Sequence, residues 1–306
     1  MDEKKCHQIP MTVNEQLKNL KLKQLIIEDE ENARSFLNDV SYFRLVKAYS
    51  LGLKEKNHDY FENVTFEQIK QLYLFNAKFR QALFPKIEII EVNLRCRISN
   101  YFSNKYGVLG YEDSANFRKQ CYHEHFMNDI QGEINRNSKA PFVKNFQENY
   151  VDGKIPFYAL IELFSFGTLS KFYKNMKNLD KKDIANSYNV TYTYLESWIE
   201  SISYVRNICA HYGRLYNAKL PKTPILYSDY IDLGIKNNRV FATLLCMKYL
   251  IKNDRHWEEF VNTIELLTEK YVTVNLKLMG FPNEWKEILL SPINMKCDKK
   301  IAESVT

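Results

Sequence analysis

Glycine and proline are scarce in this chain of 306 residues, which contains 9 glycines and 8 prolines. Because turn-rich β architecture depends on these two residues, their scarcity favours long helices. The sequence also lacks any uninterrupted apolar run near the roughly 18 residues that a membrane-spanning helix needs. Its first residues are charged and lead into no apolar segment, so we expect no secretory signal and no membrane partner.

Paired cysteines are also absent. The six cysteines are scattered between Cys6 and Cys297, and none forms a C-x-x-C pair. This distribution is typical of reduced thiols, so we expect a cytoplasmic protein without a disulfide or zinc framework. No cluster of histidines and carboxylates has metal-ligand spacing, and we therefore expect neither a metal nor another cofactor. The formal net charge of +6 favours polyanionic partners only slightly.

Apolar residues recur at helical spacing along most of the chain, and they make up 45% of it. The spacing predicts helices within 13–40 and over 66–106, 157–166, 169 onward, 193–216, 237–251, 254–277 and 284–290, with shorter helices and loops over 107–155 and a loop over 221–236. Pro85 predicts a kink or a boundary in the longest helix. Thr193 and Glu196 have the spacing of a capping box.

The expected fold class is therefore all-α. We expect a small helical N-terminal unit over residues 1–60 and a larger helical domain over residues 61–306, with a flexible tail after about residue 292.

The segment 203–217 carries the most informative polar residues. On a helical wheel, an arc of about 140° gathers polar side chains, and apolar ones fill most of the rest. The arc holds Ser203, Arg206, Asn207, Ala210, His211, Arg214 and Asn217. Arg206 and His211 lie at its opposite edges, whereas Asn207 and His211 share a face. A site that uses both Arg206 and His211 needs a long reach or a second copy of the helix, which favours a homodimer.

These side chains suit RNA cleavage without a metal. A neutral imidazole can accept the proton of a 2′-hydroxyl or protonate the leaving 5′-oxygen. A guanidinium can hold the phosphate and stabilise its developing charge. Attack by the 2′-hydroxyl would leave a 2′,3′-cyclic phosphate and a 5′-hydroxyl.

The spacing of Arg206 and His211 is not specific by itself, because about one such match is expected by chance in a chain of this composition. Arg118 and His123 also match, and we interpret that match as coincidence because no apolar arc or further motif residues surround it. The simplest alternative for Arg206 and His211 is a surface arginine and a histidine that packs between helices.

The residues around Arg206 resemble a family signature. Trp198 followed by RNICAHYGRLYN at 206–217 resembles the RNxCAHxxRLxN signature of AbiD/AbiF-like abortive-infection proteins. Four further blocks resemble those of the family in the same order, namely YFRL at 42–45, LYLFNAKFR at 72–80, IEIIEVNLR at 87–95 and PFYALIELFSFGTLS at 156–170. The resemblance covers roughly residues 15–220.

The resemblance implies a HEPN-like helical bundle, related to the nuclease domains of type VI CRISPR effectors, that acts as a toxin in phage defence. It implies that Arg206 and His211 are catalytic and that Asn207 supports them. Some members of the family are restrained by a small structured RNA. The family usually has a second histidine where this chain has Tyr212, which leaves any auxiliary role of that position open.

RNA is thus the expected partner, both as substrate and as small regulator, and we expect contacts from Arg214, Tyr212 and Arg44. Arg44 and its neighbours Tyr42 and Phe43 could equally be core aromatics with one surface charge. Two alternatives to a metal-independent endoribonuclease remain. The chain could be a non-catalytic RNA-binding module whose site only cradles phosphate, or a helical scaffold without a nucleic-acid role.

Two sets of carboxylates have more than one interpretation. Glu88, Glu91 and Arg95 share a face of the longest predicted helix. Pairing within the helix is a sufficient explanation, and the alternative is that they orient the helix that carries Arg206. Glu162 lies in a very apolar segment, so we expect it to have a buried partner such as an arginine, and the alternative is a catalytic role.

Overall fold

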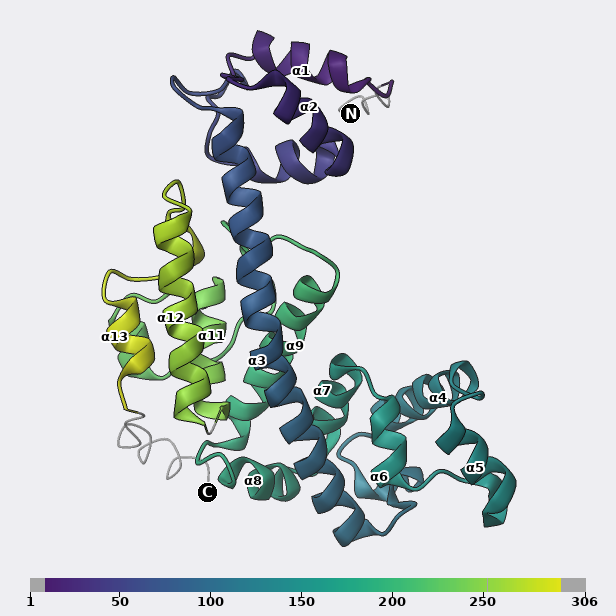
Figure 1. The fold of residues 1–306 in the computed structure, drawn as a ribbon. Coiled ribbons are helices and arrows are strands. Elements are labelled where there is room, and N and C mark those ends of the chain that lie inside the picture. The colour runs from purple at the N-terminus through teal and green to yellow at the C-terminus, as the bar shows by residue number, and fades with distance from the viewer. Residues whose placement is uncertain (1–8, 252, 293–306) are drawn as a thin grey trace, which may run out of the picture. The chain divides into compact units, whose positions relative to one another are not determined.

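A computed structural model describes residues 9–251 and 253–292, and these residues form an all-α protein (Figure 1). No strand occurs among the described residues, where extended backbone pairs only at isolated bridges such as Ile26 with Thr65. The prediction of an all-α fold is therefore confirmed. The predicted tail after residue 292 lies outside the described residues. Within the described part of the chain, no helix has both the length and the apolar character that crossing a bilayer requires.

The chain divides into two compact units, which we describe separately. The first unit comprises the chain up to Phe79 together with Glu265–Asn275. The second unit comprises Arg80–Ile264 together with the chain from Leu276 onward. Helices α3 (Phe66–Tyr106) and α12 (Asp254–Lys270) contribute residues to both units.

The first unit is built on α1 (Val13–Leu22) and α2 (Glu30–Asp39), which pack against each other. Thr12 and Glu15 cap α1 reciprocally, and the Asp29 carboxylate accepts from the Asn32 N–H at 2.9 Å to start α2. The acidic residues Asp29, Glu30 and Glu31 therefore lie at the start of α2. A π-helix (Phe43–Lys47) follows α2 and precedes α3.

The long helix α3 confirms the prediction of a helix over 66–106. Pro85 lies inside it without ending it, although the missing N–H of proline removes one hydrogen bond from that turn. In the second unit, α3 buries one apolar stripe whose members are at most 1% exposed, namely Leu83, Ile87, Ile90, Leu94 and Ile98. This stripe is spaced by three or four residues, as an amphipathic helix requires.

The second unit contains α9, the helix that carries the candidate site. Its helices are α4 (Gln120–Arg136), α5 (Pro141–Asn149), α6 (Phe157–Leu160), α7 (Phe166–Asn175), α8 (Asn178–Asn186), α9 (Tyr192–Ala210), α10 (Ser228–Asp232), α11 (Val240–Leu250), the first part of α12, and α13 (Trp285–Leu290). Helix α9 packs against α7, α8 and α11, and α3 runs close to it (Figure 1). Trp198 is buried in α9, and its indole N–H donates to the Ile225 carbonyl at 2.7 Å.

Several predicted boundaries differ from the structure. The predicted helix over 157–166 is wrong in extent, because α6 ends at Leu160, a 3₁₀ turn covers Ile161–Leu163, and the Ser165 hydroxyl caps α7. Helix α4 has 17 residues and is longer than expected, and α10 lies in a segment predicted as loop. The predicted capping box of Thr193 and Glu196 is wrong, because Thr191 is the N-cap of α9. Glu196 instead binds the buried ammonium of Lys181 at 2.6 Å.

Candidate functional site

Helix α9 ends at Ala210, directly before the candidate histidine, and His211 is its C-cap. Tyr212 has a left-handed backbone with a φ of 57°. The N–H of Gly213 donates to the Ile208 carbonyl at 2.7 Å, and the N–H of Tyr212 donates to the Cys209 carbonyl at 3.3 Å. These two bonds form a Schellman motif. The prediction that the helix continues to about Tyr216 is therefore wrong.

Gly213 is consequently part of the turn that ends α9, not a mid-helix residue. A Cβ at this position would lie 2.9 Å from the Ile208 Cγ2 atom and 3.2 Å from the Ile208 carbonyl oxygen. A side chain would have to displace backbone there, so the close approach requires glycine. Leu215 and Tyr216 then turn into the core. Burial of these two residues commits the chain to leaving the helix axis.

The second half of the motif is built into this turn. Arg214 is only partly exposed, and its Nη1 donates to the Tyr216 carbonyl at 2.7 Å. Asn217 has a φ of 51°, and its amide oxygen accepts from Arg239 Nη1 at 3.3 Å. Arg214 and Asn217 therefore do not extend the polar arc of α9. Ser203 does not belong to an exposed arc either, because it is buried.

Tyr212→Gly is expected to stabilise the protein by about 1 kcal/mol relative to Tyr212→Ala. Both substitutions remove the ring, which is 70% exposed, but only glycine adopts a positive φ without a Cβ penalty. Thermal denaturation would show the difference as a rise in Tm of roughly 2 °C. A glycine variant that melts no higher than the alanine variant would contradict a strained left-handed Tyr212.

Arg206 of α9 is held in place by residues of α3. Its Nε lies 3.3 Å from Oε2 of Glu91, an ion pair without the angle of a hydrogen bond. The centre of its guanidinium lies 5.7 Å from the centroid of the Phe84 ring. The side chain stays 30% exposed. Arg206 is therefore fixed at its Nε by Glu91, while part of its side chain stays accessible. Anion binding requires this arrangement.

Glu91 connects Arg206 to a second arginine. Its other carboxylate oxygen lies 3.0 Å from Arg95 Nη2, and only 13% of the Glu91 side chain is exposed. Arg95 also donates to the carbonyls of Ile161 and Phe164, at the junction of α6 and α7. Both interpretations of Glu91 are thus present in the structure, because it pairs within α3 and contacts the candidate arginine.

Glu162 has the expected kind of partner. Arg95 is buried, and its Nε lies 4.0 Å from the Glu162 carboxylate. The Glu162 side chain itself is 62% exposed. The hydrogen bonds of Arg95 go to backbone carbonyls and to Glu91, so Glu162 contacts it only at this longer distance. Glu88 is exposed on α3, the helix that also carries Arg95.

His211 and Asn207 lie together on the exposed side of the helix end. The backbone N–H of His211 donates to the Asn207 carbonyl at 3.0 Å, and both side chains are exposed. Among the described residues, no hydrogen bond, ion pair or ring contact joins Arg206 to His211. Within one copy of the chain the two side chains are therefore not in contact. One copy of the chain presents the arginine and the histidine separately.

Two neighbours complete the surroundings of the helix end. The guanidinium of Arg80 lies 5.8 Å from the centroid of the Tyr212 ring, so a cation faces an exposed aromatic beside His211. Burial raises the pKa of the Cys209 thiol to about 12, an effect that Arg80 opposes. Cys209 is therefore a thiol at neutral pH and not a nucleophile.

Arg80 and Phe84 were not predicted as site residues, although the sequence contains a signal for them. On a wheel of α3, Arg80, Phe84, Glu91 and Arg95 fall within an arc of about 60°. A cation, a ring, a carboxylate and a second cation on one stripe of a single helix would have identified the support of Arg206. The other predicted RNA contact, Arg44, is exposed in the first unit.

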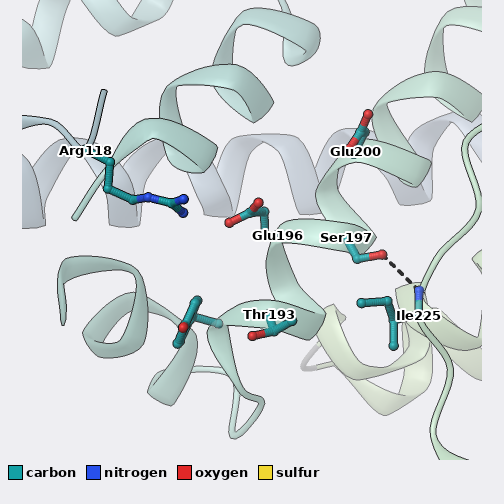
Figure 2. Close-up of a pocket in the computed structure, with 7 residues that line it drawn as sticks. Arg118, Thr193, Glu196, Ser197, Glu200 and Ile225 are labelled. Carbon is teal, nitrogen blue, oxygen red and sulfur yellow. Dashed lines mark hydrogen bonds between the residues drawn. The ribbon is translucent and has the colours of Figure 1, made fainter. Parts of the chain in front are cut away.

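The alternative match of Arg118 and His123 has a structural role. His123 is buried, and its Nε2 lies 2.8 Å from the Tyr111 carbonyl. Arg118 lines a pocket of about 310 Å³ beside the opposite half of α9 (Figure 2). The other lining residues are Tyr192, Thr193, Glu196, Ser197, Glu200 and Ile225. Its carboxylates are engaged, Glu196 by Lys181 and Glu200 by Lys174, and its Ser197 hydroxyl accepts from the Ile225 N–H (Figure 2).

This pocket therefore does not contain the candidate catalytic residues. In the described part of the chain, no three His, Cys, Asp or Glu side chains gather closely enough to hold a metal ion. The end of α9 with its support from α3 is the best candidate for the site.

Comparison with known protein families gives a match, and the matched region contains this site. The family model described as Abi-like protein matches residues 35–217, which is more than half of the chain and includes Arg206 and His211. Neither the curated proteins nor the solved structures give a match.

Proposed function

The chain belongs to the Abi-like protein family, and from that premise we propose that it is a metal-independent endoribonuclease of the HEPN type that acts as a toxin in abortive infection. The observation that supports this most is the Arg206–Glu91–Arg95 bridge, which fixes the Arg206 guanidinium while leaving 30% of the side chain exposed. The bridge restricts the conformations of both arginine side chains, and a guanidinium fixed in this way is suited to binding a phosphate.

In the proposed reaction, the RNA backbone is cleaved by an intramolecular attack. The 2′-oxygen attacks the adjacent phosphorus, the bond from phosphorus to the 5′-oxygen breaks, and a 2′,3′-cyclic phosphate forms. His211 accepts the proton of the 2′-hydroxyl or protonates the leaving 5′-oxygen. Arg206 stabilises the charge on the phosphate oxygens. Asn207 shares a face with His211 and would orient the imidazole or the phosphate.

We further propose that the active species is a homodimer in which two α9 ends face each other. One chain carries a single motif, and its Arg206 is turned towards α3 while His211 is exposed. A two-fold arrangement would place the histidine of one copy near the arginine of the other. The phosphate would then be held from both sides.

The remaining RNA contacts follow from the surroundings of the site. Tyr212 offers an exposed ring for a base next to the scissile phosphate, and Arg214 adds charge at the turn. Arg44 offers a contact in the first unit. A small structured RNA bound to the same groups would keep the nuclease inactive, and the toxin would act once that RNA is lost.

The proposed function predicts that the purified protein cuts single-stranded RNA in EDTA, because arginine and histidine supply the chemistry. The expected products carry a 2′,3′-cyclic phosphate and a 5′-hydroxyl. Gel analysis of end-labelled RNA, with and without phosphatase and 5′-kinase treatment, identifies both ends. Complete inhibition by EDTA, or products with 5′-phosphates, would refute the metal-independent mechanism.

One observation favours a second candidate, a non-catalytic RNA-binding module. Within one chain, no described contact brings the histidine to the arginine. A protein that stays monomeric would then only cradle phosphate. The same assay separates the two functions, because this candidate predicts RNA binding without new RNA ends.

A further inference from the structure

The first unit exposes a ring and two cations on an uncommon helix type. Phe43, Arg44 and Lys47 are exposed on the π-helix that follows α2, and 79% of the Phe43 surface is accessible. Leu45 and Val46 of the same turn are fully buried and anchor it. Wide turns of this kind are rare, and they occur frequently at functional sites. A phenylalanine that is 79% exposed contributes little to the packing of the described unit.

Lys54 lies within electrostatic reach of Lys47 in this turn, and also of Lys23. The Lys54 ammonium lies 4.3 Å from the centroid of the Tyr60 ring, and the Tyr60 N–H donates to the Lys23 carbonyl at 3.0 Å. Burial lowers the pKa of Lys54, and the charges of Lys23 and Lys47 lower it further, while Asp59 opposes them. The Lys54 ammonium is therefore close enough to those of Lys23 and Lys47 to be repelled by both.

The pairing of charges elsewhere in the unit is different. Lys21 and Arg34 both pair with Glu30, and Lys70 pairs with Glu67. Among the described residues, Lys23, Lys47 and Lys54 form no ion pair. Neighbouring cations that form no ion pair cost stability, and a polyanionic ligand would offset that cost.

We propose that Phe43, Arg44 and Lys47, together with Lys23 and Lys54, form a basic–aromatic surface that binds single-stranded RNA. Phe43 stacks on a base, and the cations hold the phosphates on either side of it. RNA as the ligand rests on the proposed function, and the surface adds a binding site in the unit that does not contain Arg206 and His211. A bilayer is the less fitting ligand, because a single ring inserts too little apolar surface for stable membrane binding.

The test measures RNA binding in the full-length His211→Ala protein, so that cleavage cannot consume the ligand. The probe is a short fluorescein-labelled oligouridylate, followed by fluorescence anisotropy over a range of salt concentrations. Phe43→Ala is expected to weaken binding about 10-fold, whereas Phe43→Tyr retains the ring and the affinity. Lys47→Ala is expected to lower the slope of log K against log salt by about 0.7. Lys18→Ala removes an equally exposed lysine of α1 and is expected to change neither value.

Unchanged binding in both Phe43→Ala and Lys47→Ala would overturn the proposal, as would an equal loss in Lys18→Ala. All of these side chains are exposed, so unchanged thermal melting identifies the effects as losses of contact. Cleavage by the wild type separates the two proposals. If the wild type cleaves RNA but Phe43→Ala and Lys47→Ala bind it normally, the nuclease proposal holds and the basic–aromatic surface is rejected. If RNA binding depends on Phe43 and Lys47 but the wild type does not cleave RNA, the surface holds and the nuclease proposal is rejected. Binding to phosphatidylserine vesicles that depends on Phe43, without RNA binding, would replace RNA by a lipid surface.

Discussion

Replacement of either Arg206 or His211 by alanine is expected to reduce RNA cleavage by at least about 100-fold while the protein stays folded. Removal of a general acid or base typically costs 10²–10⁴ in rate, and removal of a charge-stabilising donor about 10²–10³. The fold should persist because His211 is exposed and Arg206 is partly exposed at the end of α9. Single-turnover cleavage rates at saturating protein measure the loss directly.

Matched controls for these variants lie next to each other on α12. Arg255 and His256 are exposed, and Arg255→Ala and His256→Ala remove the same two side-chain types away from the site. Both controls are expected to cleave RNA at the wild-type rate. Full activity in Arg206→Ala or in His211→Ala would exclude the proposed chemistry.

Mixing the two inactive variants tests the proposed homodimer. If each site combines the arginine of one copy with the histidine of the other, a mixed dimer contains one intact site. The mixture is then expected to regain a fraction of the wild-type rate, which neither variant has alone. An active wild-type monomer in light scattering at the assay concentration would contradict the dimer.

Glu91→Gln is expected to lower the maximal cleavage rate about 10- to 100-fold with little change in KM, because a misplaced group can cost about 100-fold in rate. The glutamine keeps the shape of the side chain but removes the charge that holds Arg206 at 3.3 Å and Arg95 at 3.0 Å. Arg206 would then move relative to the phosphate. Glu91 is thus expected to be a positioning residue for Arg206 and not a catalytic one.

Stability alone cannot produce this pattern of kinetics. Leaving two arginines next to a neutral amide is expected to cost about 1–3 kcal/mol of folding stability, which thermal denaturation measures separately. Glu88→Gln is the control, because Glu88 is an exposed carboxylate on the same helix. A Glu91→Gln protein that melts lower but cleaves at the wild-type maximal rate would assign Glu91 a purely structural role.

Local patterns in the sequence were sufficient for the fold class and for the candidate pair. Scarce glycine and proline and a helical period predicted the all-α fold, and the long helix over 66–106 was predicted at its observed bounds. These features are encoded by neighbouring residues, because burying one face of a helix needs only a repeat of three or four. The pair Arg206 and His211 was predicted from its motif, and its catalytic role stays a prediction.

The end of α9 could not be predicted by the same means. Continuing the helix through Gly213 and stopping it at His211 are both compatible with the local residues. The choice depends on Leu215 and Tyr216, which become buried only if the chain turns away at the Schellman motif. Burial of this kind involves residues distant in the sequence, and a helical wheel contains no information about them.

The sequence by itself determined the helical class, the family and the identity of the candidate pair, because these depend on composition, period and short motifs. Only the tertiary structure decided what surrounds that pair. It brought Glu91 and Phe84 of α3 to Arg206 of α9 and directed Arg95 to the carbonyls between α6 and α7. The physical reason is that no periodic pattern in the sequence marks the two partners of an ion pair. Its partners are chosen by the packing of helices that are far apart in the chain, and that packing is a property of the folded core.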